Sequence, residues 1–167
     1  MFRRYDGIMR LRRKSTPSFQ GLIPASAASS RAKRMNRSVG TGHEQMLGSA
    51  LWRLGLRYRK NVATLPGKPD IVFPSARLVV FCDGDFWHGR RWRALSAKLR
   101  SGANASYWLQ KIEGNRRRDR KMSRVLAADG WTVLRIWESE IKKAPDRIAL
   151  TIAGLVRDRR EASHAIH

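Results

Sequence analysis

Residues 70–83, DIVFPSARLVVFCD, decide the fold. Two short runs of β-branched and aromatic residues, at 70–73 and 77–82, flank the turn-forming Pro-Ser-Ala at 74–76. Such runs favour strands, and a connection this short joins them as an antiparallel hairpin. The segment LPGKP at 65–69 predicts a further turn just before the hairpin.

Outward from the hairpin, the spacing of apolar residues predicts the other elements. A helix is expected at 46–54, a strand at 57–61, a long helix at about 106–128, a strand at 131–137 and a last helix at about 146–160. Gly55 and Gly130 are suited to end the first two helices, Gly114 is expected to interrupt the long one, and residues 89–105 are expected to be a basic loop. The order predicts an α/β fold in which an antiparallel meander leads into a β-α-β crossover.

Composition narrows the class of protein. The chain has 167 residues, a length typical of one domain, and 42% of them are apolar. Lys and Arg number 35 against 13 Asp and Glu, which gives a net charge of +22. Because such an excess opposes compaction by self-repulsion, the sequence predicts a polyanionic partner, and nucleic acid ranks ahead of a membrane surface.

Several other classes are excluded. The sequence has no run of about 18 apolar residues, so a membrane-spanning helix is not expected. The basic start lacks the apolar run of a secretory signal. The single cysteine, Cys82, excludes an internal disulfide and any zinc site with two or more cysteines, and it fits the reducing cytoplasm.

Residues 1–35 differ in composition from the rest of the chain. They begin with a basic stretch and continue through the Ala- and Ser-rich segment 25–30, which has no apolar periodicity. Two interpretations stay open: a nucleic-acid-binding arm, or a disordered leader or even a mis-assigned start, with Met35 as the true first residue. Residues 36–167 are expected to form the single folded domain.

Acidic residues are scarce, so their positions are informative. Asp70 opens one strand of the hairpin, Asp83 closes the other, and Asp85 follows two residues later. If the strands pair, two carboxylates meet at one end of the sheet, where repulsion raises one pKa unless a divalent cation neutralises them. Oxygen ligands suit Mg²⁺, and in this cationic chain they point to phosphodiester hydrolysis, with His88 as general acid or base. The alternative is that the aspartates are turn residues and His88 an ordinary surface or partly buried histidine.

Aromatic and basic residues follow the hairpin. Phe86, Trp87 and Trp92 lie in a Gly- and Arg-rich loop, and Trp108 follows a second loop. Exposed aromatics among arginines can stack on bases or wedge between base steps, although a core pair beside a loop is the alternative. Phosphate contacts are expected from Lys68, Arg90, Arg91, Asn115, Arg116 and Arg117. For the cationic run at 115–121 the alternative is a solvated helix face.

Many of these residues stand in one ordered pattern. LPGKPDIVF at 65–73, VVF at 79–81, Gly84 and FWH at 86–88 are followed by YWLQKI at 107–112, RDR at 118–120, GW at 130–131 and WE at 137–138. Over about residues 31–140 this pattern resembles the very short patch repair (Vsr-type) mismatch endonucleases. The motifs are specific together, whereas any one of them alone would be weak.

The resemblance implies a fold, a reaction and a set of site residues. Members of that family have the PD-(D/E)xK-type restriction-endonuclease core, a central mixed β-sheet flanked by helices, and nick double-stranded DNA beside a T:G mismatch with Mg²⁺. By position, Asp70 matches the metal-binding aspartate, the backbone carbonyl of Cys82 a second metal ligand, His88 the catalytic histidine, Asp119 its acidic partner, and Glu44 an acid of the same site. Phe86, Trp87 and Trp108 match the aromatics that wedge into the duplex.

The chain departs from the family at two places. Asp83 stands where the family has its second active-site histidine, so it is expected to act in catalysis and to add a carboxylate ligand. The positions of the family's structural zinc site are Asp85, Arg90, Trp92 and Ser139, so no structural zinc is expected. Asp85 and Arg90 are expected to form an ion pair in its place, while Trp92 packs into the space.

The prediction is therefore a Mg²⁺-dependent DNA endonuclease that nicks double-stranded DNA at T:G mismatches. It is expected to be cytoplasmic, without membrane contact, and to act on a mismatch as a monomer. Two alternatives stay open: site-specific nicking or restriction on the same core, and a non-catalytic DNA-binding protein.

Overall fold

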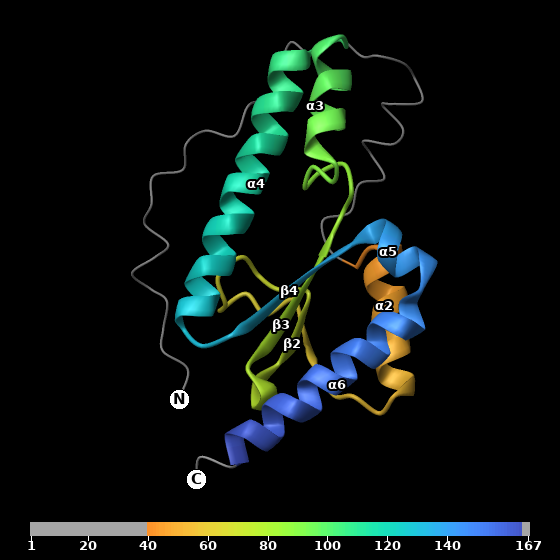
Figure 1. The fold of residues 1–167 in the computed structure, drawn as a ribbon, viewed down its shortest axis with the longest axis vertical. Helices are drawn as coiled ribbons and strands as arrows, with labels where there is room; N and C mark the ends of the chain where they lie inside the picture. Colours follow the sequence, from red (N-terminus) through yellow and green to blue (C-terminus); the bar gives the residue numbers. More distant parts are fainter. Residues whose placement is uncertain (1–39, 165–167) are drawn as a thin grey trace.

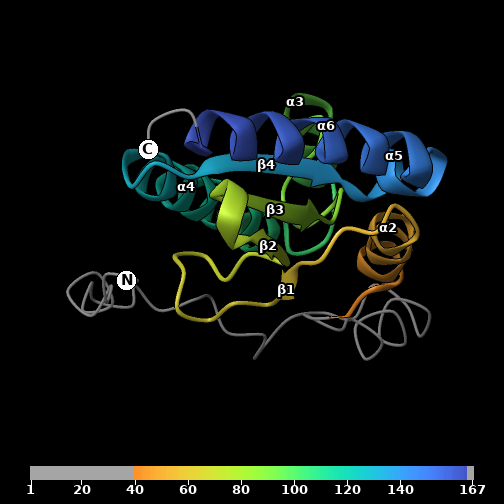
Figure 2. The same ribbon diagram turned by 90° about the horizontal axis from the view of Figure 1, so that it is seen from below.

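The structure is a computed structural model that describes residues 40–164, so the predicted arm at 1–35 lies outside the described residues. Its elements are α2 (Gly42–Arg53), β1 (Arg59–Lys60), β2 (Ile71–Phe73), the 3₁₀ turn η1 (Pro74–Ala76), β3 (Leu78–Asp83), α3 (Trp92–Arg100), α4 (Ala105–Ala128), β4 (Thr132–Trp137), α5 (Glu138–Lys143) and α6 (Pro145–His164). They form an α/β arrangement with helices on both sides of the sheet (Figures 1 and 2).

The four strands form one mixed sheet in the order β1-β2-β3-β4. β2 pairs antiparallel with both β1 and β3, and β4 lies parallel to β3, which confirms the predicted meander and crossover. All six residues of β3 are buried. A strand covered on both faces reads as a continuous apolar run rather than as an alternating one, which explains the segment 78–82.

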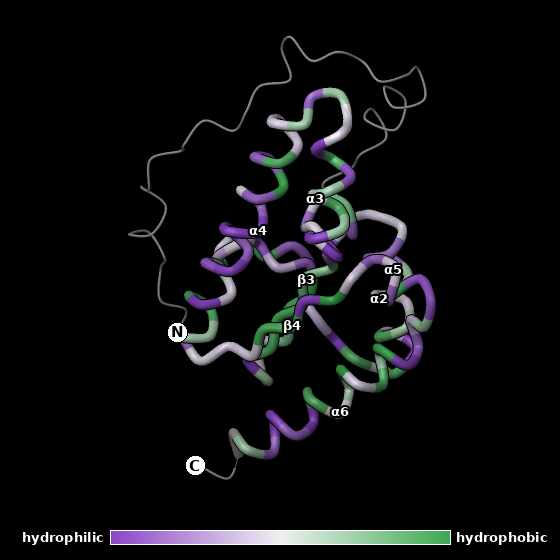
Figure 3. The backbone as a smooth tube through the Cα atoms, turned by 45° about the horizontal axis from the view of Figure 1, so that its top comes forward, coloured by the Kyte–Doolittle hydropathy of each residue, from purple (hydrophilic) through white to green (hydrophobic). Residues whose placement is uncertain are grey.

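The core lies in two layers, one on each face of the sheet. Residues 78, 80 and 82 of β3 pack with α2, α5 and α6, whereas residues 79 and 81 pack with Leu126 of α4 and with Trp131. Figure 3 shows that hydrophobic residues concentrate along β3 and β4 and hydrophilic ones along α4. By the same alternation Asp83, the last residue of β3, lies on the α4 face.

Three expectations about local structure were wrong. The expected loop at 89–105 contains α3, because Trp92, Leu95 and Leu99 recur at helical spacing and the helix packs against α4. α4 continues through Gly114, where a side chain would meet nothing within 4 Å; tertiary packing offsets the low helix propensity of glycine. The strand expected at 57–61 is only Arg59–Lys60, which pair with Val72 and Ile71 of β2.

α3 and α4 pack side by side and extend beyond the end of the sheet (Figure 1). α5, a single short helix after β4, was not anticipated either, and its Ile141 is fully buried against α2 and α6. Between residues 40 and 164, no helix combines the length and the apolar character needed to cross a membrane.

Candidate active site at the end of β3

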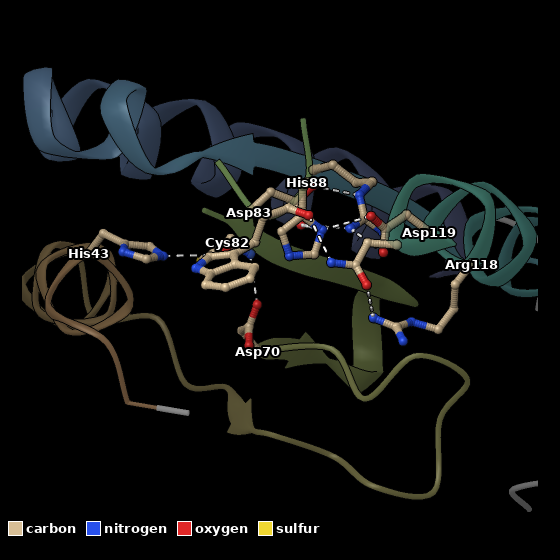
Figure 4. Close-up of polar contacts among 10 residues, drawn as sticks. His43, Asp70, Cys82, Asp83, His88, Arg118 and Asp119 are labelled. Carbon is tan, nitrogen blue, oxygen red and sulfur yellow. Dashed lines mark hydrogen bonds and ion pairs between the residues drawn. The ribbon is translucent and has the colours of Figure 1, made fainter. Parts of the chain in front are cut away.

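The hairpin brings Asp70 and the end of β3 together, as the sequence predicted. Asp70 directly precedes β2, and its Oδ2 accepts a hydrogen bond from the backbone N–H of Cys82 at 2.7 Å. Asp83 directly follows Cys82 in the chain, and its negative charge raises the pKa of Asp70. Figure 4 shows Asp70, Cys82 and Asp83 at this end of the sheet.

The Asp70 carboxylate is in an environment that resists its negative charge. Burial raises its pKa to about 6 from the ordinary 3.8, the Cys82 N–H opposes this shift, and the negative charges of Glu44 and Asp83 add to it. Glu44 is fixed in the first turn of α2, where it accepts hydrogen bonds from the N–H of Gly40 at 2.9 Å and the hydroxyl of Thr41 at 2.7 Å. A carboxylate beside other negative charges in this way favours a bound cation.

His88 is held by Asp119, as predicted. The two residues come from the loop after β3 and from α4, and the Nδ1–Oδ2 distance is 2.7 Å. Burial raises the pKa of Asp119, but the hydrogen bond from His88 and the positive charge of Arg135 outweigh it and leave that pKa below its usual range. Because an ionised carboxylate only accepts hydrogen bonds, Nδ1 carries the proton and Nε2 is the nitrogen left to exchange one.

The loop that carries His88 has a defined turn. The His88 N–H donates to the Gly84 carbonyl at 3.1 Å, and Gly89 follows with a φ of +69°. A Cβ at Gly89 would lie 2.8 Å from Cδ of Arg116 and 3.0 Å from Cγ2 of Ile112. Glycine at this position therefore lets the His88 loop approach α4 closely enough to reach Asp119.

Asp83 has a partner that the sequence analysis missed. Its two carboxylate oxygens accept hydrogen bonds from Nε and Nη2 of Arg135 at 2.7 and 2.6 Å, and its side chain is only 5% exposed. Oδ1 of Asp83 also lies 3.5 Å from Nδ1 of His88. The sequence carried one signal for this pair: Arg135 interrupts the otherwise apolar stretch of β4 beside a fully buried strand.

A second residue that the sequence analysis missed is His43. Its side chain is 8% exposed, and its Nε2 lies 3.3 Å from the Cys82 carbonyl oxygen and 3.1 Å from Oγ1 of Thr41. Its Nδ1 lies 4.0 Å from a carboxylate oxygen of Glu138. His43 directly precedes Glu44 in the segment TGHE at 41–44, which has the Ser/Thr-x-x-Glu spacing of a helix start.

Phe86, Trp87 and Trp108 form one aromatic cluster beside the site. Their ring centroids are 5.2 to 5.8 Å apart in tilted or edge-to-face arrangements. Phe86 is 37% exposed, whereas the two tryptophans are half-buried. Asn115, which was predicted to contact DNA, donates a hydrogen bond from Nδ2 to the Trp87 carbonyl at 2.9 Å, so it fixes this loop to α4.

The predicted phosphate contacts fall into two groups. Arg90 lies 3.7 Å from Asp85, which confirms the expected ion pair, and it also bonds Glu140 at 3.0 Å. Arg116 lies over the ring of Trp92 at 5.1 Å. Exposed at the surface are Lys68, Arg91 and Arg117.

A cation site at the sheet edge would depend on oxygen atoms. Between residues 40 and 164, no group of three or more His, Cys, Asp or Glu side chains is arranged to hold a metal ion. Asp70 and Cys82 lie at adjacent strand ends, and the negative charges of Glu44 and Asp83 act on the half-buried Asp70 carboxylate. This donor set fits Mg²⁺, which keeps several waters and binds through one or two carboxylates plus the phosphates of its substrate.

Comparison with known proteins identifies the family of the chain. The family described as DNA mismatch endonuclease Vsr matches residues 25–94. The type II nicking enzyme V.NmeDIP of Neisseria meningitidis serogroup C is 41% identical over 128 residues, 77% of this chain and 85% of that protein. The type II nicking enzyme V.HpaIIP of Haemophilus parainfluenzae is 37% identical over 127 residues, 76% of this chain and 89% of its own.

The DNA mismatch endonuclease Vsr of Escherichia coli is 34% identical over 116 residues, 70% of this chain and 72% of that enzyme. The relatives therefore include both a mismatch endonuclease and type II nicking enzymes. The aligned lengths span most of each protein, and the chain belongs to the Vsr family of DNA mismatch endonucleases.

Proposed function

We propose that the protein is a Mg²⁺-dependent endonuclease with a restriction-endonuclease-type core, and that it nicks double-stranded DNA at T:G mismatches. The observation that carries this proposal is the juxtaposition of two units at the end of β3: Asp70 with the acids around it, and the His88–Asp119 pair. A cation site beside a general acid–base group is what phosphodiester hydrolysis requires. The net charge of +22 supports DNA as the substrate.

Asp70 and the Cys82 carbonyl are the proposed metal ligands, with Glu44 as a further acid beside them. When bound, Mg²⁺ would supply an activated water and neutralise charge on the scissile phosphate. Asp83 was also predicted as a ligand, but Arg135 binds both of its oxygens. This argues against metal binding by Asp83.

His88 is the proposed proton-transfer group. Asp119 fixes the imidazole so that Nε2 is directed to the reactants, where it handles the proton of the attacking water or of the leaving group. Phe86, Trp87 and Trp108 are proposed to wedge into the duplex, and the exposed cations Lys68, Arg91 and Arg117 to contact phosphates. One chain carries all of these groups, which supports action as a monomer.

The substrate is tested with end-labelled duplexes that are identical except for one T:G pair, incubated with Mg²⁺. We expect one nick beside the mismatch and at least about 100-fold slower cutting of the fully paired duplex, because wedging aromatics open a mismatched step at lower cost. Equal cutting of both duplexes would replace mismatch specificity by site-specific nicking, which the names of V.NmeDIP and V.HpaIIP favour. Tight binding to both duplexes without any cutting would contradict the proposed endonuclease activity and favour a non-catalytic DNA-binding protein.

Removal of divalent metal with EDTA distinguishes an ion that is needed for catalysis from one that stabilises the fold. EDTA is expected to abolish nicking, and an excess of Mg²⁺ to restore it. The melting temperature should change by less than about 2 °C, because the proposed ion sits at the rim of the sheet and not within the core. Circular dichroism during heating, with and without EDTA, measures this. A fall of about 10 °C or more would mean that a metal stabilises the fold, against the expectation of no structural zinc.

A further inference from the structure

A single guanidinium on β4 connects the two carboxylates around His88. Arg135 binds Asp83 through two hydrogen bonds of 2.6 and 2.7 Å, and its Nη2 also lies 3.1 Å from Oδ1 of Asp119. Its side chain is only 23% exposed and its Cζ lies 4.6 Å from the centroid of the Phe81 ring. Phe81 therefore supports the guanidinium from one face, and the two acids occupy its edge.

Both of these carboxylates are within reach of the same imidazole nitrogen. Nδ1 of His88 lies 2.7 Å from Asp119 and 3.5 Å from Asp83. One N–H cannot bond both acids well, so the geometry has to select one of them. Because Arg135 takes both oxygens of Asp83, Asp119 is the acceptor that remains for His88.

The charges of Asp83 and Asp119 explain why a positively charged side chain is needed between them. The side chains of Asp83 and Asp119 are only 5% and 16% exposed, and both contact Nη2 of Arg135. Two carboxylates that lie this close together with little solvent around them repel each other. Arginine stays charged and its planar fork matches carboxylates bidentately, which lysine cannot do. Without Arg135, Asp83 would be free to rotate toward Nδ1 of His88 or toward Asp70.

We propose that Arg135 is a positioning residue that holds Asp83 away from His88 and so leaves the imidazole oriented by Asp119 alone. The inference rests on the proposed nuclease function. It also gives Asp83, which replaces a histidine of the related endonucleases, a role that depends on Arg135. Arg135 and Asp83 then act as a unit, so the loss of either partner alone is expected to lower the nicking rate.

The test compares Arg135→Gln, Arg135→Lys and the double variant Asp83→Asn/Arg135→Gln with wild type. The readouts are the single-turnover nicking rate at saturating enzyme and the Kd for the same duplex. Arg135→Gln should lower the rate about 100-fold, the order of loss expected from a misplaced catalytic group, with Kd changed less than about threefold. Arg135→Lys should recover part of the rate. The double variant should be at least about tenfold faster than Arg135→Gln, because the unpaired charge is gone.

The matched control is Arg53→Gln, which removes an exposed arginine paired with Asp146 far from the site. It should leave the rate and Kd unchanged. If Arg135→Gln fails to fold, the comparison of the lysine and double variants with wild type decides the question, because both keep the carboxylate of Asp119 and avoid an unpaired Asp83. A double variant no faster than Arg135→Gln, or a loss that appears wholly in Kd, would overturn the proposal.

A spectroscopic readout keeps this proposal separate from the nuclease function. With ¹⁵N-labelled histidine, the Nδ1–H of His88 bonded to Asp119 should give a slowly exchanging proton resonance in the wild-type protein without DNA. His88→Gln assigns this resonance among the four histidines of the chain. Arg135→Gln should broaden or shift it, and Arg53→Gln should not. An unchanged resonance in Arg135→Gln would overturn the positioning role, whereas failure of the wild type to nick any duplex would contradict only the proposed function.

Discussion

Asp70→Asn is expected to abolish Mg²⁺-dependent nicking and, at the same time, to stabilise the fold above pH 6. The loss of activity should exceed about 1000-fold, because a neutral amide is a poor Mg²⁺ ligand at the only carboxylate that the Cys82 N–H fixes at the sheet edge. The gain in stability follows from the Asp70 pKa, which burial and the nearby Glu44 and Asp83 raise to about 6.

The pH dependence has a definite sign. The unfolded chain loses the Asp70 proton near pH 4, whereas the folded chain keeps it until about pH 6, so the carboxylate lowers the free energy of unfolding as pH rises through this window. One pKa unit corresponds to about 1.4 kcal/mol, so the cost is about 2–3 kcal/mol above pH 6. Asparagine avoids this cost and still accepts the hydrogen bond from Cys82.

Urea unfolding in EDTA measures the effect. Asp70→Asn and wild type should differ little at pH 4 and by about 1–3 kcal/mol in favour of the variant at pH 7.5. The control Asp158→Asn removes an exposed carboxylate on α6, 67% exposed and paired with its neighbour Arg157, and should change neither stability nor nicking. A variant less stable than wild type at pH 7.5 would show that Asp70 acts mainly through structure.

His88→Gln should lower the single-turnover nicking rate by about 10²–10⁴-fold, the usual contribution of a general acid or base. The fold should tolerate the change. His88 is 25% exposed, and Asp119 keeps Arg135 at 3.1 Å as a partner when the imidazole is removed. The rate on a T:G duplex at saturating enzyme and the melting temperature together separate a chemical role from a structural one.

Asp119→Asn is the matched comparison for His88. It retains the imidazole but replaces its ionised acceptor, so we expect a smaller loss of rate than with His88→Gln and little change in Kd. The double variant His88→Gln/Asp119→Asn should be no slower than His88→Gln, because the two residues act as a unit. Nicking by His88→Gln within about tenfold of wild type would remove His88 from the chemistry.

The sequence predicted the sheet well because its strands are locally encoded. The segment 70–83 carries its own turn, and β3 reads as a buried strand, so the meander and the meeting of Asp70 with Asp83 followed directly. α3 was missed because the basic residues and glycines around it are typical of a loop, while its apolar stripe becomes decisive only when α4 is present to cover it.

The candidate site was predicted only in part, for a physical reason. Asp70 and Asp83 lie close in sequence to the turn that joins them, and His88–Asp119 came from the family resemblance. Arg135 and His43 reach the site from β4 and α2, and such contacts depend on the sheet register and helix packing rather than on local pattern. Pairing of Asp83 with Arg135 therefore changes the expected role of Asp83 in a way that spacing alone does not indicate.

The end of β3 is the proposed metal-dependent hydrolytic site. The most direct test is one nicking assay on an end-labelled T:G duplex, with and without Mg²⁺, for wild type and Asp70→Asn prepared identically. We expect a single nicked strand from wild type only when Mg²⁺ is present, and none from Asp70→Asn, although both bind the duplex. Nicking by Asp70→Asn at the wild-type rate would contradict the proposed site, because the chemistry would then not depend on the Asp70 carboxylate.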